Sequence, residues 1–127
     1  MPPVIAVVED LLFSSRILEA ARVAGVEVRT ARRAEDVAAA LRAGSPLVLV
    51  DADSDRLPWA EAIAAVRADP SFAAVPIVAF FSHVHADRAQ AARSAGASRV
   101  LARSAFVQEL PSLLAAAASA PPQEKTR

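Results

Sequence analysis

Short apolar runs alternate along the chain with longer segments in which apolar residues recur every three or four positions. The short runs, rich in Val, Ile and Leu, are typical of strands, and the longer segments have helical periodicity. Three of the longer segments end at a glycine, which is a common helix C-cap. The pattern predicts strands at residues 4–8, 26–30, 47–50, 75–81 and 98–102. It predicts helices at residues 13–24, 34–43, from about 58, 84–95 and 107–118, with Pro111 in the first turn of the last.

The regular alternation of strands and helices predicts the fold class. Successive β–α–β units are right-handed, and they build one parallel sheet with helices on both faces. The run "LVLV" at 47–50 is apolar on both strand faces, as an interior parallel strand requires. We therefore predict an α/β domain with a five-stranded parallel sheet over residues 1–119, followed by a polar tail at 120–127.

Composition excludes several classes of partner. The 127 residues suffice for about one domain, and 14 basic residues balance 14 acidic ones, so nothing favours nucleic acid or an anionic membrane. The longest apolar run, "AAVPIVAFF", is about half of a membrane span, and the first residues lack the features of a signal peptide. The absence of cysteine excludes disulfides and thiolate metal sites. We expect a soluble, cytoplasmic domain.

Acidic residues stand where predicted strands end. Glu9 and Asp10 follow the first strand, and Asp51 ends the third. Ligands of open parallel sheets bind at the carboxyl ends of the strands, so these carboxylates converge if the two strands are neighbours. A hard divalent cation would neutralise them; alternatively, they only cap the following helices. Asp53 and Asp55 are expected to be solvated turn residues rather than side-chain ligands.

Four sequence motifs follow one another between residues 4 and 114. They are "VVED", "LVLVDAD", "VPIVAFFS" and "AQAARSAGASRVLARSAF", the last aligned on Gly96. In this order they resemble the acidic pair, the phosphoacceptor strand, the fourth strand and the Lys-Pro-Phe-type region of the receiver domains of two-component response regulators. The resemblance implies the flavodoxin-like (βα)5 receiver fold.

The resemblance also implies roles for the acids. Glu9, Asp10 and Asp51, helped by the backbone carbonyl of Asp53, would hold Mg²⁺. Asp51 would be the phosphoacceptor, a nucleophile that needs the metal to neutralise incoming charge.

Departures from the family pattern predict an atypical receiver. Phe81 stands where the family has a Thr or Ser whose hydroxyl binds the phosphoryl group, and we expect it to pack in the core. Ser82, one residue later, would point to the other face if it lay in the strand. Arg103 replaces the family's Lys and either faces Asp51 or is a plain surface residue. Ser104 replaces the usual Pro.

Aromatic and imidazole side chains near the acids are further candidates. Trp59 follows the acidic loop and is interpreted as a lid over the pocket, a partner contact or an edge residue of the third helix. His83 and His85 resemble half of a zinc site, but no third ligand stands nearby in the sequence.

We therefore expect a stand-alone receiver-like signalling domain with a sensor histidine kinase or another signalling protein as partner. In one form of this hypothesis Asp51 accepts a phosphoryl group, and the switch is impaired or non-standard. In the other form the domain is a phosphorylation-independent pseudo-receiver that acts as a protein-interaction module. Its last helices and fifth strand would then contact a partner or a second copy of the chain.

A metal-dependent enzyme is the alternative from another class. The "DAD" motif resembles haloacid-dehalogenase phosphatases, and a strand-end Glu with Asp-x-Asp resembles Toprim domains. The further phosphatase motifs are missing, and Leu11 and Arg56 stand where Toprim chains usually have glycine. No basic surplus is present to hold DNA phosphates. We therefore expect that the protein is not an enzyme.

Overall fold

The computed structural model describes residues 2–119, apart from the side chain of His83. The polar tail predicted at 120–127 lies outside these residues. Strands and helices alternate through the described chain. In chain order they are β1 (Val4–Val7), α1 (Leu11–Ala24), β2 (Val28–Thr30), α2 (Ala34–Arg42), β3 (Val48–Asp51), α3 (Trp59–Ala68), β4 (Ile77–Phe81), α4 (Ala86–Ala95), β5 (Arg99–Ala102) and α5 (Arg103–Ser119). Two short 3-10 helices, η1 (Pro70–Phe72) and η2 (His83–His85), precede β4 and α4.

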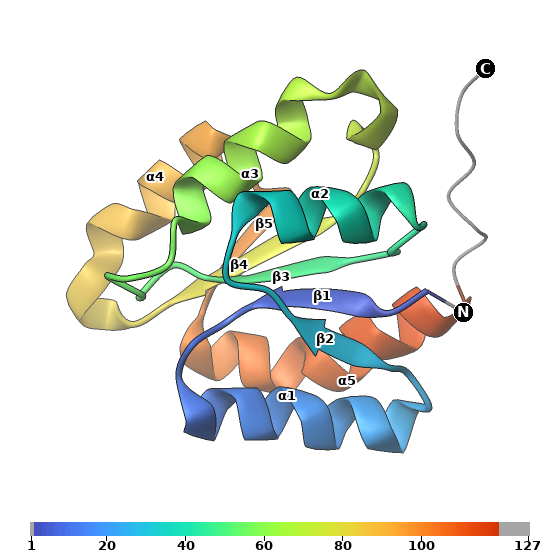
Figure 1. Cartoon of the computed structure of the whole chain (residues 1–127). Coiled ribbons are helices and arrows are strands. Elements are labelled where there is room, and N and C mark those ends of the chain that lie inside the picture. The colour runs from blue at the N-terminus through green and yellow to red at the C-terminus, as the bar shows by residue number, and fades with distance from the viewer. Residues whose placement is uncertain (1, 120–127) are drawn as a thin grey trace.

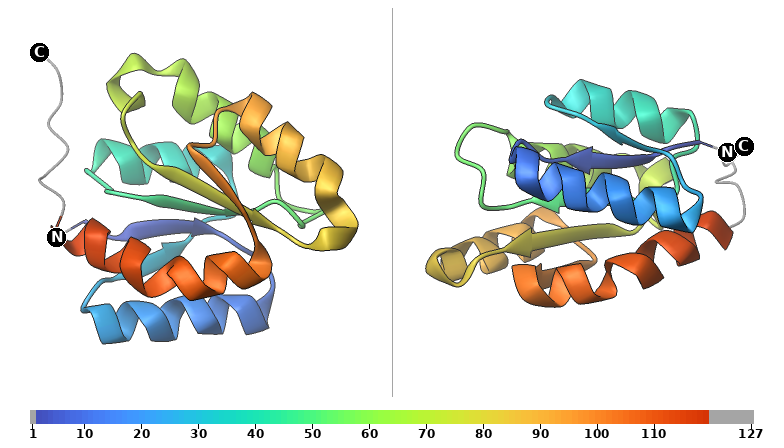
Figure 2. Two further views of the ribbon diagram at one scale, coloured as in Figure 1. Left: turned by 180° about the vertical axis from the view of Figure 1, so that it is seen from behind. Right: turned by 90° about the horizontal axis from the view of Figure 1, so that it is seen from below.

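One parallel sheet with the strand order β2-β1-β3-β4-β5 forms the middle layer (Figure 1). Helices α2, α3 and α4 cover one face, and α1 and α5 lie side by side on the other (Figures 1 and 2). The predicted α/β fold with helices on both faces is therefore confirmed. All of the predicted strands and helices are present, with boundaries shifted by a few residues.

Each face of the sheet has its own apolar core. Strands β1 and β3 are buried along their whole length, which explains their unbroken runs of apolar residues. On the α1–α5 face, the rings of Phe13, Phe80 and Phe106 stack, with centroids 4.3 to 5.8 Å apart. Full burial of a large apolar side chain stabilises the fold by about 1.5–3 kcal/mol. The three rings therefore join α1, β4 and α5 just below the carboxyl edge of the sheet.

Gly96 ends α4 in a left-handed conformation with φ 118°. A Cβ atom here would overlap the Cγ atom of Arg67. The Arg67 side chain fills this space because it donates to the Gly96 carbonyl at 2.7 Å and to the Ser98 hydroxyl at 2.8 Å. Glycine is thus required both by the backbone conformation and by the close approach of α3.

The start of the last helix differs most from the prediction. Helix α5 begins at Arg103, directly after β5, and not at residue 107. Pro111 therefore lies inside the helix, and its predicted place in the first turn is wrong. Because proline has no N–H, this position makes no intrahelical hydrogen bond to the preceding turn. Within residues 2–119, no helix has the length and apolar composition that crossing a membrane would require.

Candidate functional site

The acids that follow β1 and β3 meet at the point where the strand order reverses. The chain continues from β1 to β2 on one side, and β3 pairs with β1 on the other, with Val7 opposite Val50. Open α/β sheets bind their ligands in the crevice at such a point, beyond the carboxyl ends of the strands. Glu9 and Asp10 follow β1, and Asp51 is the last residue of β3. The structure therefore brings the predicted acids to one place.

A cleft of about 540 Å³ lies over these strand ends. We call it the acid pocket. Its lining combines five acids with two arginines and a few small or apolar side chains: Glu9, Asp10, Leu11, Leu12, Asp51, Asp53, Ser54, Asp55, Arg56 and Arg103.

Asp51 lies at the bottom of the acid pocket and is only 2% exposed. Its Oδ1 atom accepts the backbone N–H of Asp53 at 2.8 Å, and its Oδ2 atom lies 3.5 Å from Nη2 of Arg103. Burial raises the pKa of Asp51 above its ordinary value, although the Asp53 N–H and the charge of Arg103 act in the opposite direction. Asp51 is thus a buried carboxyl group with one oxygen directed at a cation.

Asp53 is the most extensively bonded carboxylate of the site, and its predicted place in a solvated turn is wrong. Its side chain is 10% exposed. Oδ1 lies 2.9 Å from both the backbone nitrogen of Ser82 and Nδ1 of His85, and Oδ2 accepts from Nε of Arg103 at 2.7 Å. Burial alone would raise the pKa of Asp53, but these hydrogen bonds and the charge of Arg103 together lower it below its ordinary value. Asp55, in contrast, is 79% exposed and pairs with Arg88.

Arg103 lies at the centre of the buried acids and is not a plain surface residue. Its guanidinium faces Asp51 and Asp53, and Nη1 lies 3.7 Å from Oδ2 of Asp10. The guanidinium carbon also lies 4.5 Å from the centroid of the Phe13 ring, in cation–π range. Because Arg103 is the first residue of α5, the helix dipole disfavours its charge. The carboxylates are therefore what stabilises a cation in this position.

Glu9 and Asp10 have different environments. Oδ1 of Asp10 accepts the N–H of Phe13 at 3.0 Å, so this residue caps α1 as well as facing Arg103. Glu9 is turned the other way, with its Oε2 atom 3.2 Å from Arg32 and 3.9 Å from Arg56. The capping alternative thus holds for Asp10, whereas Glu9 belongs to an exposed ion-pair cluster.

The donor set does not fit a divalent cation as it is arranged. Among the residues that the structure describes, no group of three His, Cys, Asp or Glu side chains is placed to hold a metal. Each of Asp10, Asp51 and Asp53 already has an N–H donor at Oδ1 and faces Arg103 with Oδ2. The Mg²⁺ that the resemblance implies would have to compete with these contacts.

The loop after β4 carries contacts that sequence reasoning missed. Ser82 lies beyond the end of the strand, so the alternation that would turn it to the other face does not apply: its hydroxyl lies 3.3 Å from Oδ1 of Asp53. His85 contacts the same carboxylate, with Nδ1 2.9 Å from Oδ1 of Asp53. The predicted His83–His85 pair involves the His83 side chain, which lies outside the described residues. Phe81 is partly buried and packs against the core on the α2–α4 face. The signal for His85 was its position in the loop after a strand that borders the site.

Two residues near the pocket have structural roles. Trp59 is 9% exposed and packs in the core at the start of α3. Its interpretation as a lid or partner contact is therefore wrong, because the first turn of α3 directs it inward. Arg88 of α4 donates to the backbone carbonyls of Ala52 and Ser54 at 3.1 and 3.3 Å. It attaches the β3–α3 loop to α4.

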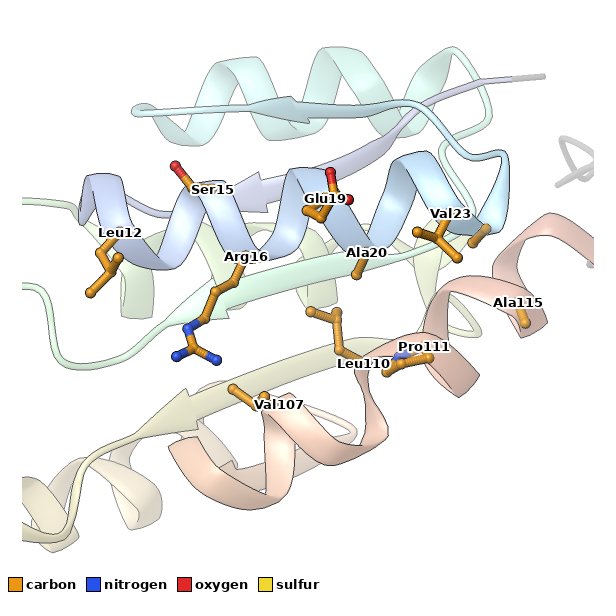
Figure 3. A pocket seen from close by; sticks show the side chains of 11 residues that line it. Leu12, Ser15, Arg16, Glu19, Ala20, Val23, Val107, Leu110, Pro111 and Ala115 are labelled. Atoms are coloured by element: carbon orange, nitrogen blue, oxygen red, sulfur yellow. The ribbon is translucent and has the colours of Figure 1, made fainter.

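A second cleft, of about 590 Å³, lies between α1 and α5 (Figure 3). Apolar side chains such as Leu12, Val23 and Leu110 line most of it, and Arg16 and Glu19 lie on its α1 side. Pro111 faces this groove from within α5. The groove contains none of the buried carboxylates of the acid pocket.

Comparison with known proteins identifies the fold. No protein-family model matches the sequence, and no curated protein matches it. Solved structures of response regulators, however, are similar over most of the chain. A response regulator protein from Burkholderia multivorans is 27% identical, with 95% of this chain and 98% of that one covered and a TM-score of 0.70.

Two further solved structures have lower sequence identity. The chemotaxis response regulator CheY4 of Vibrio cholerae is 22% identical, with 92% of this chain and 98% of that one covered and a TM-score of 0.72. The Mn²⁺-bound form of the response regulator Rcp1 is 18% identical, with 94% and 93% covered and a TM-score of 0.66. The sheet order and the helix layers define a flavodoxin-like (βα)5 domain. Together these findings show that the chain has the receiver fold of response regulators, and the predicted resemblance is confirmed.

Proposed function

We propose that this chain is a receiver-like signalling domain of a two-component phosphorelay, with Asp51 as its phosphoacceptor and a sensor histidine kinase as its partner. The observation that carries the proposal is the position of Asp51. It ends β3 at the strand-order reversal, lies at the bottom of the acid pocket, and directs one carboxylate oxygen toward a guanidinium. In a receiver fold, this is the place for a carboxylate that exchanges a phosphoryl group with a partner.

The residues present support a defined transfer step. Oδ2 of the ionised Asp51 would attack the phosphorus of a phosphohistidine, and the P–N bond would break with its electron pair returning to the imidazole. An acyl phosphate would form on Asp51. The guanidinium of Arg103, 3.5 Å from Oδ2, would stabilise the charge that develops on the phosphoryl oxygens. The N–H of Asp53 would orient the carboxylate through Oδ1.

Labelling with acetyl phosphate, followed by intact-mass measurement, tests the proposal. The wild type is expected to gain one phosphoryl group, and peptide mapping should place it on Asp51. Asp51→Asn should remove the label, whereas Asp55→Asn is the matched control and should keep it, since Asp55 lies in the same loop but is exposed. A wild type that stays unlabelled, or a label that persists in Asp51→Asn, would contradict the assignment.

A second candidate is a phosphorylation-independent interaction module. Two observations favour it. Phe81 stands where receiver domains have a Thr or Ser hydroxyl, and Asp53 already contacts Ser82 and His85. The β4–α4 loop is thus tied to the pocket without a phosphoryl group. In this form, α4, β5 and α5 would contact a partner or a second copy of the chain. Sedimentation that reports the same mass with and without acetyl phosphate, together with absent labelling, would favour it.

The domain receives a phosphoryl group and does not turn over a substrate, so phosphate release from a phosphomonoester or metal-dependent DNA cleavage would contradict the proposal. The domain acts in the cytoplasm, because its partner kinase takes phosphoryl groups from the ATP found there. Mg²⁺ remains the metal that the resemblance implies, and labelling should therefore be measured with and without it.

A further inference from the structure

The carboxylates of the acid pocket share a pattern of oxygen use. In Asp10, Asp51 and Asp53, the Oδ1 atom accepts a backbone N–H, from Phe13, Asp53 and Ser82 respectively, at 2.8 to 3.0 Å. These contacts fix the orientation of each carboxylate. The second oxygen of each residue is therefore directed to a common point.

The guanidinium of Arg103 occupies that point. Its nitrogens Nη1, Nη2 and Nε face Oδ2 of Asp10, Asp51 and Asp53 at 3.7, 3.5 and 2.7 Å. A planar group with several fixed donors can meet three carboxylates at once, which a single ammonium group does less well. One positive charge thus lies where three negative charges converge.

Aromatic packing holds the guanidinium in this position. The Phe13 ring lies 4.5 Å from its central carbon and the Phe80 ring 5.8 Å from it. Both rings belong to the buried stack on the α1–α5 face, so they cannot withdraw without opening the core. The side chain of Arg103 is 29% exposed. It is accordingly a built-in part of the pocket and not a solvated side chain that happens to lie nearby.

We propose that Arg103 is an internal counter-ion that occupies the cation position of the acid pocket. A divalent cation needs several oxygen ligands at about 2.0–2.6 Å, and the Oδ2 atoms it would use are those that face Arg103. The metal and the guanidinium therefore compete for the same oxygens. Arg103 already supplies one positive charge to the wild-type pocket, which takes up Mg²⁺ or Mn²⁺ only when Arg103 withdraws.

Metal titration of the full chain tests this competition. Mn²⁺ binding is followed by the EPR signal of the free ion, and Mg²⁺ binding by calorimetry. Arg103→Gln removes the charge and is expected to bind Mn²⁺ at least about tenfold more tightly than the wild type, because it removes a cation from within ~4 Å of the metal position. Arg103→Lys keeps a charge but cannot contact three carboxylates at once. Its Mn²⁺ affinity should therefore lie between those of the wild type and Arg103→Gln.

Two control variants separate this effect from a general change in charge. Arg56→Gln removes an exposed arginine that lines the same pocket, and Arg99→Gln removes one that pairs with Glu109 on β5 and α5. Both should change Mn²⁺ affinity by less than about twofold, because exposed charges are screened by salt. Equal affinities of wild type and Arg103→Gln, or no uptake by either, would overturn the proposal.

A readout in the wild type covers the case in which Arg103→Gln does not fold. The NMR signal of the Arg103 Nε–H is assigned by its loss in Arg103→Lys. Saturating Mg²⁺ should shift this signal, because the Nε–Asp53 hydrogen bond breaks when the guanidinium leaves. Metal binding that leaves the signal unchanged would overturn the proposal. Since no phosphoryl transfer is measured, this outcome is independent of whether Asp51 becomes labelled.

Discussion

On the β1 side of the acid pocket, the carboxylate of Glu9 faces Arg32 and Arg56, whose side chains are 69% and 83% exposed. On the β3 side, the carboxylates of Asp51 and Asp53 are almost completely buried and face Arg103. Both sides balance acid against arginine. Exposed pairs contribute little because water and salt screen them, whereas a buried charge without its partner costs several kcal/mol. The buried contacts on the β3 side are therefore expected to stabilise the arrangement of the pocket more than the pairs of Glu9 with exposed arginines do.

Asp53→Asn is expected to have the largest effect on stability. The substitution removes the charge that accepts from Ser82, His85 and Arg103, and hydrogen bonds to charged groups contribute about 1.5–3 kcal/mol. The free energy of unfolding in urea should fall by about that amount. Asp55→Asn, in the exposed part of the same loop, should change it by less than about 0.5 kcal/mol. Equal effects of the two substitutions would contradict the comparison.

Asp51→Asn should act in the opposite direction. Burial raises the pKa of Asp51, so its ionised form costs stability at neutral pH, and the neutral amide removes this cost. We expect the free energy of unfolding to rise by on the order of 1 kcal/mol. A clear loss of stability in the same urea titration would mean that the contact with Arg103 outweighs the burial of Asp51.

The two aspartates should also respond oppositely to pH. The lowered pKa of Asp53 contributes stability above its unfolded value of about 3.9, and this contribution is lost as the pH falls through the folded value. Because the pKa of Asp51 is raised in the folded state, its ionisation costs stability, and this cost appears as the pH rises above the same unfolded value. Unfolding measured at several pH values should therefore show both substitution effects shrinking toward acid pH. Substitution effects on the free energy of unfolding that do not change with pH would contradict the lowered pKa of Asp53 and the raised pKa of Asp51.

Glu9→Gln should have the smallest effect. Its partners are exposed, so the free energy of unfolding should change by less than about 0.5 kcal/mol and still less at high salt. Thermal or urea unfolding at low and high ionic strength checks this. A loss as large as that of Asp53→Asn would show that the two sides of the pocket do not differ as proposed.

The fold could be predicted because apolar residues recur along the sequence with the spacing typical of each strand or helix. Apolar strands and helices with one apolar face alternate clearly, and this alternation predicts one parallel sheet with right-handed connections. The strand order came from the structure. The start of α5 was missed because β5 runs into it at Arg103 without an intervening polar loop. Boundaries of this kind depend on packing against the rest of the domain rather than on local pattern.

The site could be predicted only in part, for a related reason. Strand ends meet at one edge of a parallel sheet, so Glu9, Asp10 and Asp51 could be placed from their positions alone. Asp53 and His85 lie in loops whose paths depend on contacts far apart in the chain, and periodicity does not determine these paths. Trp59 was misplaced because its burial depends on the orientation of α3.

The central claim is that Arg103 and the buried aspartates form one coupled ionic network, and a double-mutant cycle tests it most directly. Unfolding free energies are measured for the wild type, Asp53→Asn, Arg103→Gln and the double variant. A coupling of at least about 1 kcal/mol is expected, since residues in one buried network couple by about 0.5–3 kcal/mol. Effects that add within about 0.3–0.5 kcal/mol would contradict the claim, because they would show that the two side chains stabilise the domain independently.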